Sequence, residues 1–270
     1  MKVFWVILAA FPTLVQAQID TIYIERQDIV RGVDAVMFTF TSPVRWKGND
    51  WLKVGGIVAG TAALTLLDEP VRNYLKGKDC KFLDGFERVG YHYGKPYSAA
   101  AFTGGFYLTG VLLKNEWAKE TGLILASALT TGTVVQTLFK NAVGRARPGM
   151  ELGNYSAEPF STSPSYHSLP SGHTTVALTI SLVLARQVES VPVKIFFYSL
   201  GTVTAASRLY ADAHWTSDLA FGGAIAWFCA DAAMRRLEAN HFRSVIRKRK
   251  DGTQWKLYPY PGGLSLRGRL

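Results

Sequence analysis

The sequence predicts an all-α protein, a six-helix bundle that is embedded in a membrane. Six apolar stretches lack Asp, Glu, Lys and Arg, and all six are rich in Ala, Gly, Thr and Leu. Small residues of this kind let helices approach closely within a bilayer. The six stretches cover residues 54–67, 97–113, 121–139, 168–185, 195–207 and 219–230.

The lengths of these stretches bear on how many of them cross the membrane. A span needs about 20 mostly apolar residues, whereas stretches of about 10–14 are as typical of buried core helices. Residues 121–139 and 168–185 are long enough, and residues 54–67 and 219–230 are short. The number of spans therefore stays open, and a soluble, exported helical bundle is the alternative to a membrane protein.

The N-terminus is typical of a secretory signal. Lys2 precedes an apolar run, and small residues up to Ala17 stand at the spacing of a cleavage site. We expect a signal peptide over residues 1–17, with an uncleaved anchor as the alternative, and export in either case. An exported N-terminal segment over 18–51 should follow, exposed and holding at most one short helix.

The helical bundle is predicted over residues 52–240 and a basic, aromatic tail over 241–270. Lys and Arg gather in the chain after residue 234, which favours a cytoplasmic C-terminus. If residues 54–67 do not span, the ends of the third and fifth stretches face outward. We prefer this arrangement, which corresponds to a bacterial-type cell envelope with the polar clusters on the periplasmic side.

The charge balance and the cysteines narrow the choice of partners. The net charge is +10, which suits an anionic ligand or an anionic membrane surface. No basic stripe interleaved with aromatic residues is present, so nucleic acid is not an expected partner. Cys80 and Cys229 do not form a disulfide framework.

Three polar clusters interrupt the apolar pattern. The first, with Lys140 and Arg147, follows the third stretch, and Pro148 should end that helix. Taken alone, its cations could simply offset the negative end of the helix dipole. The second, residues 170–175, opens the fourth stretch, where Ser171 can cap a helix and Gly172 lets an oxyanion approach the free amides.

The third cluster covers residues 207–218. His214 and Asp218 are four apart, so a helix that begins near His214 brings them within reach of each other. A carboxylate bound to one ring nitrogen fixes the tautomer and frees the other nitrogen to act as a nucleophile or a base. Arg208 adds a fork of donors suited to an oxyanion.

In an antiparallel bundle the three clusters share one rim. Their cations and helix amides suit a tetrahedral anion. No Cys/His set has zinc spacing and no acidic cluster suits magnesium, so we expect neither a metal nor a cofactor.

The spacing of the three clusters resembles a known tripartite signature. Lys140-x6-Arg147-Pro148, Pro170-Ser171-Gly172-His173 and Ser207-Arg208-x5-His214-x3-Asp218 are similar to the motifs of the type 2 phosphatidic acid phosphatase and vanadium haloperoxidase superfamily. The motifs lie within residues 140–218, and the helical resemblance extends over about 52–235. Asp212 departs from the pattern, because the family often has Gly there, but Asp tolerates a left-handed backbone.

This resemblance implies a role for each matching residue. His214 would be the nucleophile that forms a phosphohistidine, Asp218 would orient it, and His173 would protonate the leaving group. The residues that would hold the phosphoryl oxygens are Lys140, Arg147, Ser171, Gly172 and Arg208. We expect supporting or structural roles for Arg145, Asn141 and Ser207, and loop or surface positions for His92, His167 and His241.

The resemblance also implies a function. It predicts a metal-independent phosphatase of the cell envelope that hydrolyses a phosphomonoester or pyrophosphate, with a phosphorylated lipid as the expected substrate. The alternatives are a soluble, exported nonspecific acid phosphatase, a vanadate-dependent haloperoxidase, and a membrane protein with a decayed site. The oligomeric state stays open.

Overall fold

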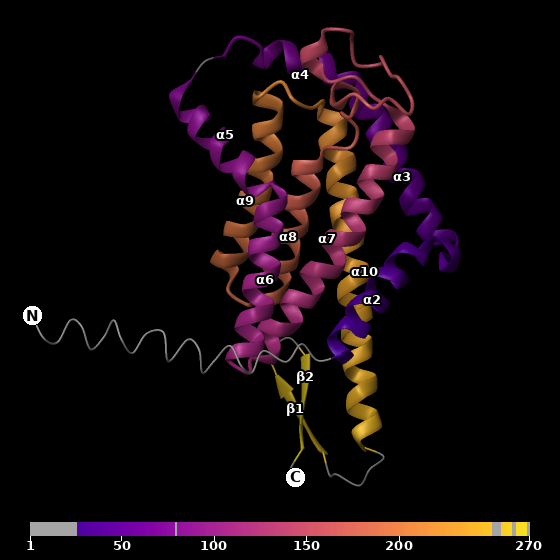
Figure 1. The fold of residues 1–270 in the computed structure, drawn as a ribbon, viewed down its shortest axis with the longest axis vertical. Coiled ribbons are helices and arrows are strands. Elements are labelled where there is room, and N and C mark those ends of the chain that lie inside the picture. The colour runs from indigo at the N-terminus through magenta and orange to yellow at the C-terminus, as the bar shows by residue number, and fades with distance from the viewer. Residues whose placement is uncertain (1–25, 79, 250–254, 261–262, 269–270) are drawn as a thin grey trace, which may run out of the picture.

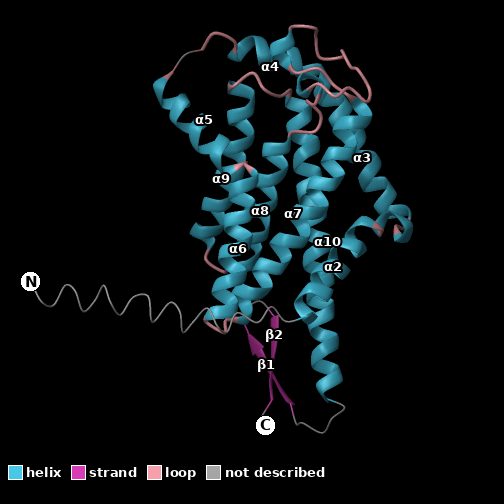
Figure 2. Ribbon diagram, in the orientation of Figure 1, coloured by secondary structure: helices cyan, strands magenta, loops and turns pink. Residues whose placement is uncertain are grey.

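A computed structural model describes residues 26–78, 80–249, 255–260 and 263–268. The predicted signal peptide and the first part of the N-terminal segment lie outside the described residues. Helices dominate the described chain (Figures 1 and 2), joined by short 3-10 turns. The helices are α2 (Arg26–Phe40), α3 (Gly48–Leu64), α4 (Asp68–Leu75), α5 (Lys81–Tyr93), α6 (Pro96–Leu112), α7 (Glu116–Val143), α8 (Gly172–Gln187), α9 (Val191–Tyr210) and α10 (Thr216–Arg249).

The predicted helical bundle is confirmed. All six apolar stretches fall mainly within helices, in order α3, α6, α7, α8, α9 and α10. Helix α2 lies in the N-terminal segment, where we expected at most one short helix, whereas α4 and α5 were not predicted. Past α10, the tail holds an antiparallel pair of strands, β1 (Trp255–Tyr260) and β2 (Gly263–Gly268), which the sequence analysis did not predict.

The core lies where α7, α8 and α10 meet. Its fully buried side chains include Ile124, Leu125, Ile180, Leu184 and Leu237. Small residues bring the neighbouring helices together, as the composition predicted. A Cβ on Gly122 would lie 2.6 Å from the backbone nitrogen of Tyr107, so α6 and α7 touch backbone to backbone there.

Helix α7 ends at Val143, earlier than Pro148, which we had expected to end it. Gly144 adopts the left-handed conformation (φ +58°), and its amide donates to the carbonyl of Lys140. A Cβ at this position would lie 1.7 Å from the carbonyl oxygen of Glu158, so only glycine fits. The prediction was wrong because a glycine cap ends the helix before proline can.

The segment before the bundle is less exposed than we expected. Helix α2 packs against α7 and α10. Asp28, Ala35 and Thr39 of this helix are buried, and Asp34 forms a two-pronged ion pair with Arg236 of α10 at 2.7 and 2.8 Å. Because one side of α2 is apolar or ion-paired, it completes the bundle instead of standing apart from it.

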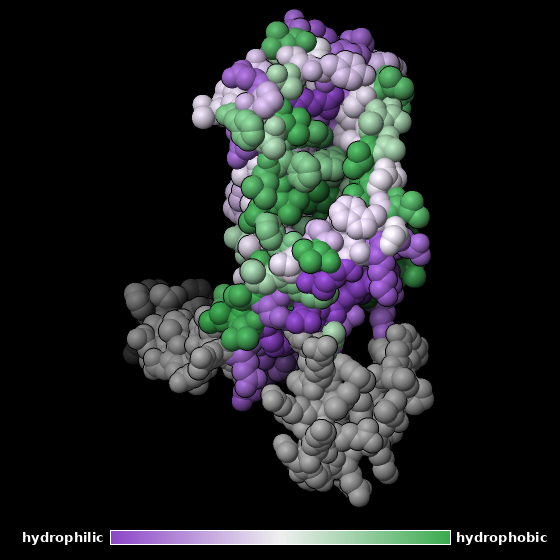
Figure 3. All heavy atoms as spheres, turned by 90° about the vertical axis from the view of Figure 1, so that its right-hand side faces the viewer, coloured by the Kyte–Doolittle hydropathy of each residue, from purple (hydrophilic) through white to green (hydrophobic). Residues whose placement is uncertain are grey.

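The outer surface of the bundle carries many apolar side chains. Figure 3 shows them gathered over the middle of one face, with hydrophilic residues towards its ends. Among the described residues, the segments Gly48–Leu75 and Glu116–Val143 are long and apolar enough to cross a membrane. Only 6% of the most apolar part of the first is buried, compared with 56% for the second. Because residues 54–67 lie within this longer apolar segment, our expectation that they are too short to cross a membrane was wrong.

Candidate active site

The structure brings the three clusters to one end of the bundle. There the end of α7, the long loop 144–171, the start of α8 and the turn between α9 and α10 come together beneath α4 (Figures 1 and 2). The Arg147 guanidinium donates to the carbonyl of Ala213 at 3.0 Å, which joins the first cluster to the third. The Ser171 amide donates to the carbonyl of Asp218 at 3.1 Å, which joins the second to the third.

His214 lies in the turn before α10, and its side chain is almost fully buried. Its Nδ1 lies 2.9 Å from the carbonyl oxygen of Ser168 and 3.6 Å from Oδ2 of Asp218. A carbonyl can only accept, so Nδ1 carries the proton and the lone pair of neutral His214 is on Nε2. The distance to Asp218 is too long for a strong hydrogen bond, so the carbonyl of Ser168 is the acceptor that fixes the tautomer. Ser168 was not among the site residues that we predicted.

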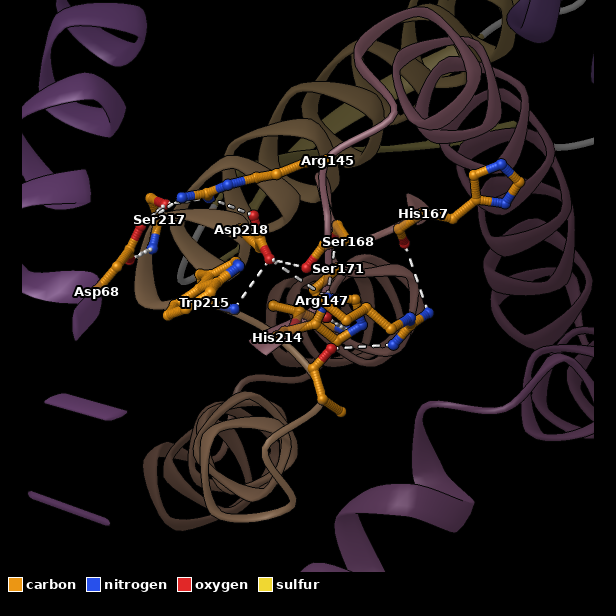
Figure 4. Close-up of polar contacts among 12 residues, drawn as sticks. Asp68, Arg145, Arg147, His167, Ser168, Ser171, His214, Trp215, Ser217 and Asp218 are labelled. Atoms are coloured by element: carbon orange, nitrogen blue, oxygen red, sulfur yellow. Dashed lines mark hydrogen bonds and ion pairs between the residues drawn. The ribbon is translucent and has the colours of Figure 1, made fainter. Parts of the chain in front are cut away.

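Asp218 is the third residue of α10 and is fully buried. Its Oδ2 accepts the amide of Trp215 at 2.9 Å, as a side chain at this position of a capping box does, and also accepts the hydroxyl of Ser168. Its Oδ1 accepts Nη1 of Arg145 at 2.7 Å. Figure 4 shows the carboxylate enclosed by these donors. Asp218 is therefore held as an anion close beneath the His214 ring.

The environment of His214 keeps its ring neutral. Burial lowers the pKa of His214 to about 4, and the cations Arg147 and Lys140 act in the same direction, while Asp218 opposes them. A neutral ring has a free lone pair on Nε2 over the whole range above that pKa. The nitrogen is thus available as a nucleophile at neutral pH.

Three cations border the same turn, and most of their bonds go to neutral oxygens. Lys140 donates to the carbonyl of His167 at 2.7 Å, and Arg147 donates to the carbonyls of Pro164 and Ala213. Arg208 is buried and donates to a carboxylate, Oε1 of Glu87, at 2.5 Å. Carbonyl oxygens orient a cation without neutralising it, so the charges of Lys140 and Arg147 remain available to an anion.

The start of α8 adds backbone donors. Ser171 is the N-cap of the helix, and its hydroxyl oxygen accepts both the amide and the hydroxyl of Thr174. Gly172 is the first helical residue, and a Cβ there would lie 3.3 Å from Oε1 of Gln136. The first amides of a helix have no partner within it and carry a positive field, which favours an anion.

His173 lies beside this helix start. Its ring stacks on Tyr91 of α5 with centroids 5.3 Å apart, and its buried Nε2 has no hydrogen-bond partner among the described residues. Burial lowers the pKa of His173 to about 3, and the charges of Arg208, His214, Lys95 and Arg147 act in the same direction. A buried polar atom without a partner is unusual in a native structure and indicates a position for a ligand.

The remaining predicted residues fall outside this centre or support it. The ring of His167 bonds to the carbonyl of Ser161 at 2.9 Å, and His92 is exposed and bonds to Tyr97. The carbonyl of Asn141 accepts the amide of Phe160. The hydroxyl of Ser207 accepts from Arg208. The side chain of His241 lies outside the described residues.

Two further residues that the sequence analysis considered, Asp212 and Arg145, lie next to the site. Asp212 adopts the left-handed conformation (φ +48°), as we predicted, and its carboxylate binds Arg72 at 2.8 and 2.9 Å. Arg145, for which we expected a supporting role, is buried and contacts Asp218 directly. Glu87 and Tyr91 of α5 were not predicted at all, since no spacing in the sequence connects them to the three clusters.

The described chain is thus an α-helical bundle. At one end of it, a buried histidine–aspartate pair lies beneath cations and helix amides, an arrangement that suits a tetrahedral anion. Residues 121–242 match the PAP2 superfamily model, and this segment contains every residue of the three clusters. This segment is therefore similar to the PAP2 superfamily.

Two lipid A 1-phosphatases are similar to part of this chain. That of Rhizobium etli is 32% identical over 114 residues, which is 40% of this chain and 47% of the relative. That of Rhizobium johnstonii is 32% identical over 114 residues, 40% of this chain and 44% of the relative. The matched segment thus spans about half the length of these curated relatives.

Two crystal structures resemble the fold. LpxE of Aquifex aeolicus has a TM-score of 0.47 and 22% identity, covering 63% of this chain and 95% of that one. The first transmembrane PAP2 type phosphatidylglycerolphosphate phosphatase from Bacillus subtilis has a TM-score of 0.36 and 17% identity, covering 66% and 96%.

Proposed function

We propose that this protein is a metal-independent phosphatase that hydrolyses a phosphomonoester or pyrophosphate of a lipid through a phosphohistidine. The observation that carries the proposal is the hydrogen bond from Nδ1 of His214 to the carbonyl of Ser168, which leaves the lone pair on Nε2. The match of residues 121–242 to the PAP2 superfamily model and the similarity to proteins named lipid A 1-phosphatases support it.

In the first step, Nε2 of His214 attacks phosphorus, and the bond from phosphorus to the leaving oxygen breaks. The bound phosphoryl dianion would raise the pKa of His173, so the ring takes up a proton with the substrate. His173 then gives this proton to the leaving oxygen, and an alcohol or a phosphate departs. Asp218 stabilises the positive charge that the His214 ring acquires. Lys140, Arg147 and Arg208, with the amides at the start of α8, bind the phosphoryl oxygens as negative charge shifts among them.

In the second step, water attacks phosphorus and gives a proton to His173, which the first step left neutral. The bond between phosphorus and Nε2 breaks, inorganic phosphate leaves, and His214 returns to its neutral form. Both histidines thus end in their starting protonation states, and one water is consumed for each phosphate released.

The lipid nature of the substrate is supported by the surface of the molecule as well as by the relatives. Exposed apolar side chains cover the middle of one face, and two described segments are long enough to cross a membrane. We place the protein in a bacterial-type cell envelope, exported by the signal peptide over residues 1–17. The site would face the periplasm if residues 54–67 do not span, and the Lys and Arg residues after position 234 favour this arrangement because they place the C-terminus in the cytoplasm.

The test is release of inorganic phosphate by detergent-solubilised protein in the presence of a metal chelator. The substrates are a lipid A-type phosphate, phosphatidate, an isoprenyl pyrophosphate and a soluble phosphate monoester. We expect the lipid esters to be cleaved faster than the soluble ester. A preference for the soluble ester would overturn the lipid assignment, and dependence on added metal would overturn the mechanism.

Replacing the nucleophile tests the mechanism itself. His214→Ala should abolish phosphate release, because the proposed nucleophile is lost, whereas His92→Ala should leave it unchanged, since His92 is an exposed histidine outside the site. Rapid acid-free quenching with a radiolabelled phosphate ester should trap label on the wild-type protein and none on His214→Ala. Full activity of His214→Ala would sink the mechanism.

A further inference from the structure

One buried carboxylate of the site comes from outside the segment that matches the family model. Asp68 is the first residue of α4 and is 1% exposed. It lies 53 positions before residue 121, where the match begins. A buried carboxylate is costly unless it is paired, so the partners of Asp68 show what it does.

The Asp68 carboxylate forms hydrogen bonds with two residues that adjoin the His214–Asp218 pair (Figure 4). Its Oδ1 accepts the amide of Ser217 at 2.9 Å, and its Oδ2 accepts the hydroxyl of Ser217 and Nη2 of Arg145, both at 2.7 Å. Ser217 is the second residue of α10, whose first amides have no partner within the helix. Asp68 therefore caps α10 from another helix, directly beside Asp218.

Arg145 is shared between the two carboxylates. Its Nη2 bonds to Asp68, its Nη1 bonds to Asp218 and to the hydroxyl of Ser217, and its Nε bonds to the carbonyl of Asn154. Arg145 as a whole is 6% exposed, so its guanidinium bonds to these partners and not to solvent. One cation between two buried anions leaves a net negative charge beneath the His214 ring.

We infer that Asp68 is a positioning residue for the nucleophile, acting through Arg145 and Asp218. With Asp68 in place, Arg145 divides its charge, and Asp218 keeps enough negative charge to stabilise the His214 ring once it bonds to phosphorus. Without it, Arg145 would pair with Asp218 alone and weaken that support. The start of α10, which carries Asp218, would also lose its outside cap. This inference rests on the proposed phosphohistidine mechanism.

The charged groups that face His214 separate this role from substrate binding. The charges of Lys140 and Arg147 act on the His214 ring from the side of α7 and the loop after it, and the charge of Asp218 acts from α10. His173, which interacts electrostatically with His214, lies at the start of α8. Arg208 lies at the end of α9. The oxyanion donors among them make no contact with Asp68. Loss of Asp68 should consequently slow the chemical step and leave the binding of a phosphate-like anion nearly unchanged.

The experiment compares Asp68→Asn with Asp34→Asn. Both remove one carboxylate charge from an N-terminal helix that holds an arginine, but Asp34 pairs with Arg236, away from the site. For Asp68→Asn we expect kcat to fall about 10–100-fold, as when other partners that orient a functional group are removed. The inhibition constant for vanadate should change less than about threefold. Asp34→Asn should retain both values, and its thermal transition should fall less than that of Asp68→Asn because the Asp34–Arg236 pair is partly exposed.

The outcomes distinguish this inference from the proposed function. If wild-type protein releases no phosphate from any substrate, both fail. If wild type is active and Asp68→Asn retains its kcat, or loses vanadate affinity in step with kcat, only the positioning role fails. Should Asp68→Asn not fold, Ser217→Ala removes the hydroxyl between Asp68 and Arg145 without changing any charge. It should lower kcat severalfold at constant vanadate affinity, and an unchanged kcat there would equally overturn the inference.

Discussion

The site is built from two layers of cations that differ in their partners. In the inner layer, the Arg145 guanidinium is bonded to two buried carboxylates, Asp68 and Asp218, at 2.7 Å each. In the outer layer, Lys140 and Arg147 donate to backbone carbonyls, which carry no formal charge. The inner layer is thus compensated, whereas the outer layer is oriented but still positive. We therefore assign a structural role to the inner layer and the binding of an anion to the outer layer. The two roles fall on neighbouring residues, because Arg145 of the inner layer and Arg147 of the outer layer belong to the same cluster.

Arg208 stands between these two cases. It belongs to the outer rim by position, yet it pairs with Glu87 and lies 5.2 Å from the centre of the Tyr91 ring. Both partners come from α5, and Tyr91 also stacks on His173. One helix therefore contacts a proposed anion-binding residue and the proposed acid together, which no spacing within residues 140–218 could indicate.

The largest effect should come from the carboxylate that joins the inner layer to the nucleophile. We expect Asp218→Asn to lower kcat by about 10³–10⁴-fold, as with the aspartate that orients the histidine of a catalytic triad. The neutral amide of the new side chain cannot offset the positive charge of the phosphorylated His214 ring. Its NH₂ group would also replace one of the oxygens that now accept hydrogen bonds, so a donor would face a donor. The measurement is single-turnover phosphate release, with circular dichroism as the control for folding. A loss below tenfold would show that Ser168 alone orients His214.

The next largest effect contrasts the two layers directly, through Arg147→Gln and Arg145→Gln. Removing Arg147 should raise the inhibition constant for vanadate at least about tenfold, because an uncompensated charge next to the anion is lost, and should hardly change the thermal transition. Removing Arg145 should destabilise the fold by about 3–5 kcal/mol, because two buried carboxylates lose their common partner.

Inhibition titrations and thermal unfolding in the same detergent measure both quantities for both variants. If the two variants lose vanadate affinity equally and stability equally, the distinction between a structural inner layer and an anion-binding outer layer is wrong.

The sequence could predict the bundle and the meeting of the three clusters because both are encoded locally. Apolar stretches without charges specify helices, and fixed spacings such as the four residues from His214 to Asp218 place side chains together. The partners of the site could not be predicted, because Asp68 meets Ser217 across 149 positions and Glu87 meets Arg208 across 121. Such contacts depend on how whole helices pack, and a single buried Asp or Glu has no local pattern that marks it.

A similar limit explains the two local errors. Pro148 seemed the natural end of α7, but the chain turns at Gly144, where the close approach of the Glu158 carbonyl requires glycine. Helix α2 seemed exposed because its buried side, with Asp28 and Ala35, is short and includes a charge. In both cases tertiary contacts that lie outside the segment determined its structure.

The smallest expected effect concerns the pH dependence of stability, and it tests whether the outer layer and burial together keep His214 neutral. The pKa of His214 is lowered from 6.5 to about 4, with burial as the first cause. The unfolded chain therefore binds a proton to this residue at a higher pH than the folded protein does. Stability is unaffected above about pH 6.5 and falls as the pH decreases from 6.5 to 4.

His214→Asn cannot titrate and should not share this loss. On going from pH 7 to pH 5, the thermal transition temperature of the wild type should therefore fall more than that of His214→Asn. The contributions of the other titrating groups are the same in both proteins and cancel in this comparison. Thermal unfolding of both proteins in the same detergent at the two pH values measures it. Parallel curves would mean that His214 titrates normally, and that the cationic rim and the burial of the ring do not hold the nucleophile in its neutral form.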